Sequence, residues 1–304
     1  MASAQAESFN ARLVRWAKEA KEGGGPDAFR ACARTLFDSL GTHFPLVLTP
    51  IESRLARAAY ADEPGKELSR NILLFFHGGA FSCGSPETHA RFAVQLGRRI
   101  DARALLVDYR LSPEHIFPHQ IEDCAAVYEW LLASGVPPQR IVFAGESAGG
   151  NLCFSAQLMA LRRGLPAPAA TYAMSPWLDF DAAGASYISN AKSDLVSGAE
   201  TTRVMSRMYL GPGVDARNPV ATPLYGDIAG LSPLFVQVGG DEVLVDDSRR
   251  VVERAQAVGI AAELDIVPEM QHMYQFDAGV MPEADASYDR AAAFIQLRLT
   301  AASA

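Results

Sequence analysis

A serine flanked by glycines, Ser147 in the run Gly-Glu-Ser-Ala-Gly-Gly of residues 145–150, is the feature that most constrains the fold. The run follows the apolar stretch 141–144 and precedes apolar residues at helical spacing. A Gly-x-Ser-x-Gly sequence between a strand and a helix forms a sharp turn that exposes the serine hydroxyl as a nucleophile. The glycines are needed because a Cβ there would collide with the neighbouring elements. The run therefore predicts a nucleophile elbow, and the alternative is an ordinary glycine-rich turn with an incidental serine.

Apolar segments of strand length recur along the rest of the chain. Helical patterns, such as those over 122–133 and 247–258, separate most of them. The expected strands are 72–76, 104–107, 141–144, 171–174, 234–238 and 262–267. Strands that are apolar almost throughout, and that alternate with helices, are typical of a parallel sheet buried on both faces. The sequence thus predicts an α/β fold with a mostly parallel central sheet and helices on both of its faces.

Two segments fall outside this alternation. The first forty residues predict two helices: an apolar stripe over 9–20, and a second helix from an N-cap at Asp27 to a stop at Gly41. Between Phe180 and about Ile228 the chain is rich in small and polar residues and has a single helical pattern, over 200–210. This stretch is too long for an ordinary connection between two strands. We therefore expect a catalytic body and a helical cap. The expected body is 46–181 with 226–304, and the expected cap is 1–45 with 182–225.

Composition excludes several classes of function. The 27 basic and 35 acidic side chains give a net charge of −8, and no basic cluster stands out, which argues against binding to nucleic acid or to anionic membranes. No secretory signal and no long apolar span is visible, so a cytoplasmic location is expected. The cysteines have neither C-x-x-C nor metal-ligand spacing, which predicts reduced thiols and no metal site. They are Cys32, Cys83, Cys124 and Cys153.

A serine nucleophile needs a general base and an acid that orients this base. His272 lies in the loop after the last predicted strand and is the best placed of the six histidines. Asp241 directly follows the strand 234–238 and two glycines, so we expect its carboxylate at the end of that strand. Asp246 and Asp247 are the alternatives, but they lie where the next helix begins and suit an N-cap. The order Ser147, Asp241, His272 is the order that this architecture uses.

Acyl transfer also requires hydrogen-bond donors for an oxyanion. Gly78 and Gly79 follow the strand 72–76, and consecutive glycines allow backbone N–H groups to approach a substrate oxygen closely. We therefore predict an oxyanion hole formed by the N–H groups of Gly78, Gly79 and Ala148. An ordinary glycine-rich turn is the alternative for the first two.

Several blocks together make the chain resemble the hormone-sensitive-lipase-like family of α/β-hydrolase esterases, also called bacterial family IV. The blocks are His-Gly-Gly-Ala-Phe at 77–81, Asp-Tyr-Arg-Leu-Ser-Pro-Glu-His at 108–115, the elbow at 145–150, Asp-Glu-Val-Leu at 241–244, and His272. The resemblance implies an α/β-hydrolase body with a helical cap. It also implies a serine carboxylesterase that acts on short- to medium-chain acyl esters without a metal or an organic cofactor. A small-molecule ester is the implied partner, and a homodimer is compatible with the family.

The chain departs from the family pattern at two positions. Ala80 replaces the third glycine of the oxyanion motif, and its methyl group is expected to narrow the pocket. Glu146 stands where the family more often has Asp or Thr, and a carboxylate buried there needs a partner that the sequence does not identify.

The substrate is less constrained than the chemistry. An amidase, a lactonase or a formamidase would use the same triad, and a ligand-binding homologue without catalysis is a further alternative. Candidate pocket walls, for which a place in the core is an equal alternative, are Phe37, Phe81, Trp177, Met205, Met208 and Tyr209.

Overall fold

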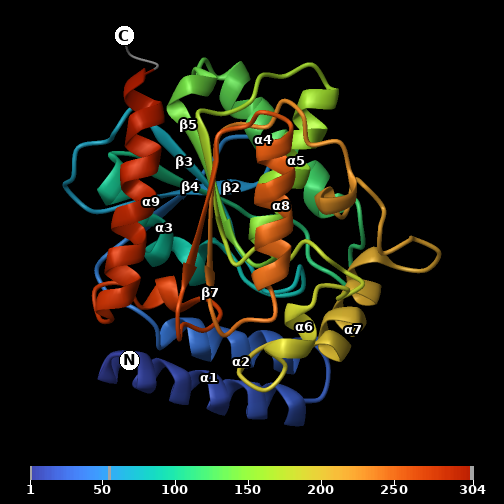
Figure 1. Cartoon of the computed structure of the whole chain (residues 1–304). Helices are drawn as coiled ribbons and strands as arrows, with labels where there is room; N and C mark the ends of the chain where they lie inside the picture. The colour runs from blue at the N-terminus through green and yellow to red at the C-terminus, as the bar shows by residue number, and fades with distance from the viewer. Residues whose placement is uncertain (1, 54–55, 302–304) are drawn as a thin grey trace.

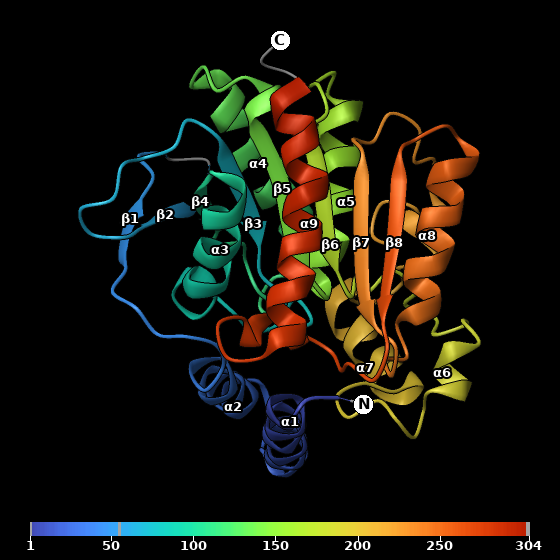
Figure 2. The same cartoon turned by 60° about the vertical axis from the view of Figure 1, so that its left-hand side comes forward.

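The computed structural model describes residues 2–53 and 56–301, which form an eight-stranded sheet covered by helices on both faces (Figures 1 and 2). The strand order is β1-β2-β4-β3-β5-β6-β7-β8. The strands are β1 Val47–Pro50, β2 Ala58–Asp62, β3 Ile72–Phe76, β4 Arg103–Val107, β5 Ile141–Glu146, β6 Ala170–Met174, β7 Leu234–Gly239 and β8 Ala262–Val267. From β4 to β8 all neighbours are parallel, whereas β2 is antiparallel to both β1 and β4. The predicted α/β class with a mostly parallel sheet is confirmed.

The helices form two layers and a group at one end of the sheet. The α-helices are α1 Ala4–Glu22, α2 Pro26–Asp38, α3 Pro86–Ile100, α4 His119–Ala133, α5 Ala148–Arg162, α6 Ser186–Ser189, α7 Ala199–Leu210, α8 Val245–Ala257 and α9 Pro282–Ala301. Helices α3 and α9 cover one face, and α4, α5 and α8 cover the other (Figure 1). Helices α1, α2, α6 and α7 gather at one end of the sheet (Figure 2).

The central strands are apolar on both faces, as a sheet between two helix layers requires. Every residue of β3 is buried. Because successive side chains of a strand point to opposite faces, Leu74 and Phe76 enter the core under α4 and α5, while Leu73 and Phe75 enter the core under α3 and α9. This two-sided burial explains why β3 reads as an unbroken apolar run rather than an alternating one.

All six predicted strands are present, but β1 and β2, the first two strands at one side of the sheet, were missed. β1 is largely exposed and only four residues long, and it ends in Thr49 and Pro50, so its two apolar residues do not form a run of strand length. The predicted N-cap of α2 was also wrong, since the cap is Gly25 and the helix begins at Pro26. Proline suits the first position of a helix because its ring fixes φ and the missing N–H would have no partner there. Asp27 lies in the first turn instead.

The N-terminal helices are held against the C-terminal part of the chain. Arg12 on α1 pairs with the buried carboxylate of Asp277, and both the backbone N–H and the hydroxyl of Ser3 donate to Glu283. The division into a separate body and cap remains a prediction. No helix in the described part of the chain combines the length and apolarity needed to cross a membrane.

Candidate active site

Ser147 lies in the turn between β5 and α5, with φ 57° and ψ −117°. This conformation is unfavourable for a residue with a side chain, and such strain is typical of functional positions. Backbone hydrogen bonds on both sides hold the turn: Ser147 N donates to Met174 O, and Trp177 N donates to Ser147 O. The predicted strand–serine–helix turn is therefore present.

The flanking glycines are explained by what surrounds them. A Cβ on Gly145 would lie 2.4 Å from the carbonyl oxygen of Gly149. A Cβ on Gly149 would lie 1.9 Å from the carbonyl oxygen of Phe76 in β3. These contacts involve backbone atoms that cannot move aside, so the close packing of α5 against β3 and β5 requires glycine at both positions.

Glu242, and not Asp241, contacts His272. Glu242 Oε2 lies 2.7 Å from His272 Nδ1. Its other oxygen, Oε1, accepts hydrogen bonds of 2.6 Å from Gly239 N and from the Ser175 hydroxyl. The carboxylate is thus held by three groups, and it fixes the imidazole so that Nε2 is free to act.

The predicted acid, Asp241, makes no contact with the histidine. Its carboxylate is partly exposed and lies 3.4 Å from the Gln271 amide nitrogen. The error is one position along the chain: the turn after β7 brings the second of the two adjacent acidic residues onto His272. The two alternatives also bind elsewhere, Asp246 to the backbone N–H of Ser186 and Asp247 to those of residues 178 and 179.

The site tunes the histidine toward its charged form. Burial alone would lower the pKa of His272, but the charge of the adjacent Glu242 carboxylate and its hydrogen bond outweigh burial, with a smaller contribution from Asp194, so this pKa is raised above its ordinary value. A negative group at Nδ1 also stabilises the imidazolium that forms when Nε2 accepts a proton.

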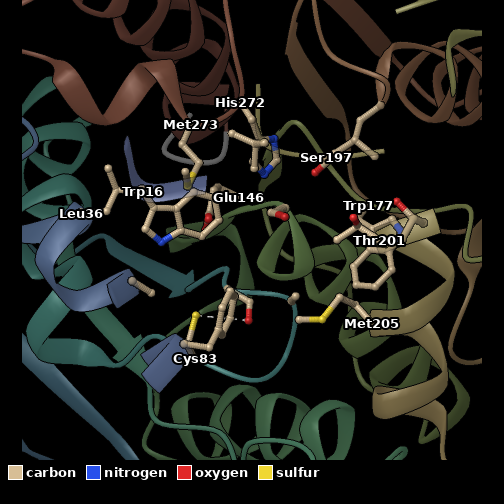
Figure 3. A pocket seen from close by; sticks show the side chains of 18 of the residues that line it. Trp16, Leu36, Cys83, Glu146, Trp177, Ser197, Thr201, Met205, His272 and Met273 are labelled. Atoms are coloured by element: carbon tan, nitrogen blue, oxygen red, sulfur yellow. Dashed lines mark hydrogen bonds between the residues drawn. The ribbon is translucent and has the colours of Figure 1, made fainter. Parts of the chain in front are cut away.

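Ser147 and His272 line the same cavity, which has a volume of about 130 Å³ (Figure 3). Its walls come from helices α1 and α2, from the 77–84 loop, and from the region of α7. Of the predicted wall residues, Phe37, Trp177 and Met205 line the cavity. The remaining three do not line it: Met208 lies away from it, and Phe81 stacks on Tyr209 in the core with ring centroids 3.7 Å apart.

The 77–84 loop faces the cavity with Gly79 and Ala80, and Gly78 is not part of the cavity wall. The φ angles are 99° at Gly79 and 52° at Ala80, so the chain turns sharply here. The direction in which a Gly78 side chain would point is filled by the carboxyl group of Glu146, 1.9 Å from the expected Cβ position. Gly78 is therefore a glycine because of Glu146, and not because it faces the cavity.

Glu146 is a second carboxyl group beside Ser147. It is 1% exposed, and neither of its oxygens makes a hydrogen bond of ordinary geometry with the described residues. Burial raises the pKa of Glu146 to about 8, against the opposing influence of His272 and the Gly78 N–H. His89 Nε2 lies 3.9 Å away, but burial also holds the pKa of His89 well below its ordinary value, so the two groups face each other uncharged at neutral pH.

The thiol nearest the site is Cys83, which lines the cavity next to Gly79. Burial raises its pKa to about 12, so it is a poor nucleophile. All four cysteines are free thiols. Within residues 2–53 and 56–301, no cluster of three or more potential metal ligands occurs.

Sequence reasoning missed Glu242 and, apart from Phe37, the contribution of the N-terminal helices to the cavity wall. The signal for Glu242 was present, since two acidic residues follow the glycine pair, but strand register alone does not choose between neighbours in a turn. The signal for the helices was the apolar stripe that includes Trp16, which could equally have been core. The residues from α1 and α2 that line the cavity are Trp16, Phe29, Ala33, Leu36 and Phe37.

Comparison with known proteins finds relatives that agree with one another, since all of them are hydrolases. The profile of a family described as the alpha/beta hydrolase fold matches residues 73–276. An acetyl-hydrolase of Streptomyces hygroscopicus is 40% identical over 225 residues, which cover 74% of this chain and 75% of the relative. An esterase of Acinetobacter venetianus is 31% identical over 255 residues, covering 83% of this chain and 84% of the relative.

Solved structures agree over almost the whole chain. An esterase from the bacterial hormone-sensitive lipase family superposes with a TM-score of 0.92 at 34% identity, covering 98% of this chain and 99% of the other. A hormone-sensitive lipase from a metagenome library gives a TM-score of 0.89 at 33% identity, with coverage of 97% and 98%.

Proposed function

The chain belongs to the α/β-hydrolase family, among the bacterial hormone-sensitive-lipase-like esterases, and is a carboxylic ester hydrolase; we propose that it acts through a triad of Ser147, His272 and Glu242. The observation that carries this proposal is the 2.7 Å contact of Glu242 with Nδ1 of His272, a histidine that lines the same cavity as Ser147.

In the proposed mechanism, His272 Nε2 accepts the Ser147 proton as the hydroxyl attacks the ester carbonyl. Glu242 holds the imidazole and stabilises its positive charge. The protonated histidine then donates to the leaving alcohol, which leaves an acyl group on Ser147. A water molecule activated by the same histidine releases the acid and restores the hydroxyl.

The oxyanion of each tetrahedral intermediate needs N–H donors close to Ser147. We assign this role to Gly79 and Ala80, which line the cavity, and to Ala148 at the start of α5. Gly78, which the sequence suggested, is less suitable because it faces the Glu146 carboxyl group.

The substrate that suits the cavity is a neutral ester with a short or medium acyl chain. A volume of about 130 Å³ accommodates a small apolar group, and the described residues of the wall include neither lysine nor arginine that would attract an anionic substrate. Amides and lactones pass through the same acyl-enzyme chemistry and are the second candidates.

The test is hydrolysis of p-nitrophenyl esters from acetate to laurate. The parent should be active, with Ser147→Ala and His272→Ala weaker by several orders of magnitude. His115→Ala, which changes an exposed histidine outside the cavity, serves as the control and should match the parent. A folded parent that is inactive on every ester would refute the ester substrate and favour amide or lactone substrates.

A further inference from the structure

Residues 190–197, which connect α6 with α7, lie against the two loops that carry the acid and the base. We call them the 190–197 segment; in Figure 1 they follow α6 at the end of the sheet where β7 terminates. The segment belongs to the insertion after β6. It is therefore far in sequence from both loops that it contacts.

The first set of contacts joins the segment to the acid loop. The Asn190 side-chain nitrogen donates to two backbone carbonyls, 2.9 Å to Gly240 O and 2.8 Å to Glu242 O. The Ser193 hydroxyl donates to Asp241 O at 3.0 Å. Side chains of the segment thus bind the backbone carbonyl groups of three consecutive residues in the turn after β7, including that of Glu242 itself.

A fourth contact comes from Asp194. Its Oδ2 accepts a 2.7 Å hydrogen bond from Val243 N, while Oδ1 accepts bonds from the N–H groups of Val196 and Ser197. The Asp194 carboxyl group therefore ties the acid loop to the part of the segment that lines the cavity, because Val196 and Ser197 are both wall residues.

The second set of contacts joins the segment to the base loop. Gln271, the residue before His272, is 3% exposed. Its amide nitrogen donates to Ser193 O at 2.9 Å, and its amide oxygen accepts from Leu195 N at 3.0 Å. The segment therefore contacts the acid loop and the base loop at the same time.

We propose that Asn190 and Gln271 are positioning residues, which fix the Glu242 loop and the His272 loop relative to each other through the 190–197 segment. The inference rests on the proposed function, since it concerns the acid and base of that triad. A carboxylate and an imidazole at 2.7 Å need both loops in place, and small displacements of catalytic groups reduce turnover strongly. The charged or titratable groups that face His272 are Glu242, Asp194 and Glu146, and neither positioning residue adds a charge to them.

The test compares Asn190→Ala and Gln271→Met with the parent. Asn218→Ala is the matched control, because Asn218 lies in the same insertion and its side chain accepts a bond from Val220 N within that insertion. Two readouts are taken on the full chain after circular dichroism shows that it is folded: kcat and KM on a p-nitrophenyl ester, and the low-field proton resonance of a histidine N–H bonded to a carboxylate. His272→Ala identifies the resonance.

We expect both positioning variants to lose kcat by about 10- to 100-fold with KM changed less than threefold. Their low-field resonance should shift or broaden, while Asn218→Ala retains both properties of the parent. The inference is refuted if Asn190→Ala and Gln271→Met keep the parent resonance and lose no more kcat than Asn218→Ala. An inactive parent would refute the proposed function instead, and the resonance would still decide the positioning role. If Asn190→Ala does not fold, Asn190→Asp, which keeps the shape but removes both donated hydrogen bonds, takes its place.

Discussion

The carboxyl group of Glu146 occupies the place where a side chain on Gly78 would have to go, with Oε1 1.9 Å from the expected Cβ. The backbone of Gly78 is not in the left-handed region, so an alanine there meets only a steric obstacle. The neighbouring Gly79 differs, since its φ is 99° and its Cβ would lie 2.5 Å from a backbone oxygen of Cys83.

The loss of stability caused by Gly78→Ala should therefore become smaller when the Glu146 side chain is shortened. In the parent we expect a loss of about 1–3 kcal/mol of unfolding free energy, as for overpacked cores. In the Glu146→Ala background the same change should be much less destabilising, which gives a coupling of about 1 kcal/mol or more. Urea denaturation of the two single variants and the double variant measures this coupling.

Gly79→Ala provides the contrast, because Glu146→Ala cannot relieve a backbone contact or a positive φ. It should destabilise the protein equally in both backgrounds. Equal penalties for Gly78→Ala with and without Glu146 would show that the two residues do not compete for space.

Glu146→Gln should stabilise the protein more at high pH than at low pH. Burial raises the pKa of Glu146 to about 8 from an ordinary value of 4.5. Below 4.5 the group is protonated in both states and has no effect. Between 4.5 and 8 the unfolded chain loses its proton while the folded chain keeps it, so the parent loses stability as the pH rises, by about 1.4 kcal/mol per unit of pKa difference at most.

The measurement is urea denaturation of parent and Glu146→Gln at pH 5, 6.5 and 8. The advantage of the variant should grow across this series. Glu253→Gln, on the exposed side of α8, removes the same charge and should show no such trend. A constant difference between Glu146→Gln and the parent would mean that Glu146 is charged in the folded protein.

The two adjacent acids should differ greatly in their effect on catalysis. Glu242→Gln keeps the shape but loses the charge that faces His272, and loss of the orienting carboxylate in a serine triad lowers kcat by about 10⁴-fold. Asp241→Asn changes a partly exposed group that does not touch the histidine, and it should stay within about threefold of the parent. The opposite order in ester hydrolysis would restore Asp241 as the acid.

The acid limb of the pH–rate profile should lie above pH 6.5. Glu242 holds the pKa of His272 above its ordinary value despite burial, and only the neutral imidazole accepts the serine proton. Activity is therefore present at higher pH and is lost as the pH falls through this raised pKa. Glu242→Gln should move the histidine titration to lower pH, which NMR of the imidazole follows even when turnover is slow. An unchanged titration would contradict this assignment of the raised pKa.

Arg250 should matter for stability far more than its neighbour Arg249. Arg250 pairs with the fully buried carboxylate of Asp179, and removal of the arginine leaves this buried charge with neutral hydrogen-bond donors alone, which costs about 3–5 kcal/mol. Arg249 makes an exposed pair with Asp246 on the same helix, and such pairs contribute about 0.5 kcal/mol. Thermal or urea unfolding of Arg250→Met and Arg249→Met compares them. Similar losses of stability in the two variants would show that the pair of Arg250 with Asp179 contributes no more than the exposed pair of Arg249 with Asp246.

The parallel strands could be predicted because burial on both faces leaves a continuous apolar run, as in β3. The edge strand β1 could not be predicted, since its apolar run is short and ends in Thr49 and Pro50, and the strand is defined by its pairing with β2. The cap of α2 could not be predicted for a different reason. The proline at the first helical position outweighed the preference of Asp27 for the capping position.

In the site, the elbow was predictable because its glycines and its serine lie within a few consecutive residues between an apolar run and a helical pattern, although the backbone contact that requires Gly149 comes from Phe76 in β3. The choice between Asp241 and Glu242 was not, because it depends on a turn whose path is set by distant groups such as Ser175 and Asn190. Glu146 and Gly78 show the same limit, since each explains the other only once their proximity is known.

The attachment of α1 has a consequence for synthesis on the ribosome. The groups that hold α1, Asp277 and Glu283, are made 265 and 280 residues after their partners Arg12 and Ser3. The attachment of α1, and of the cavity wall that carries Trp16, therefore has to wait until both of these later residues have been made. A nascent chain that stops before residue 277 already contains Ser147 and His272. It still lacks Asp277 and Glu283, the residues that hold α1 and its part of the cavity wall in place.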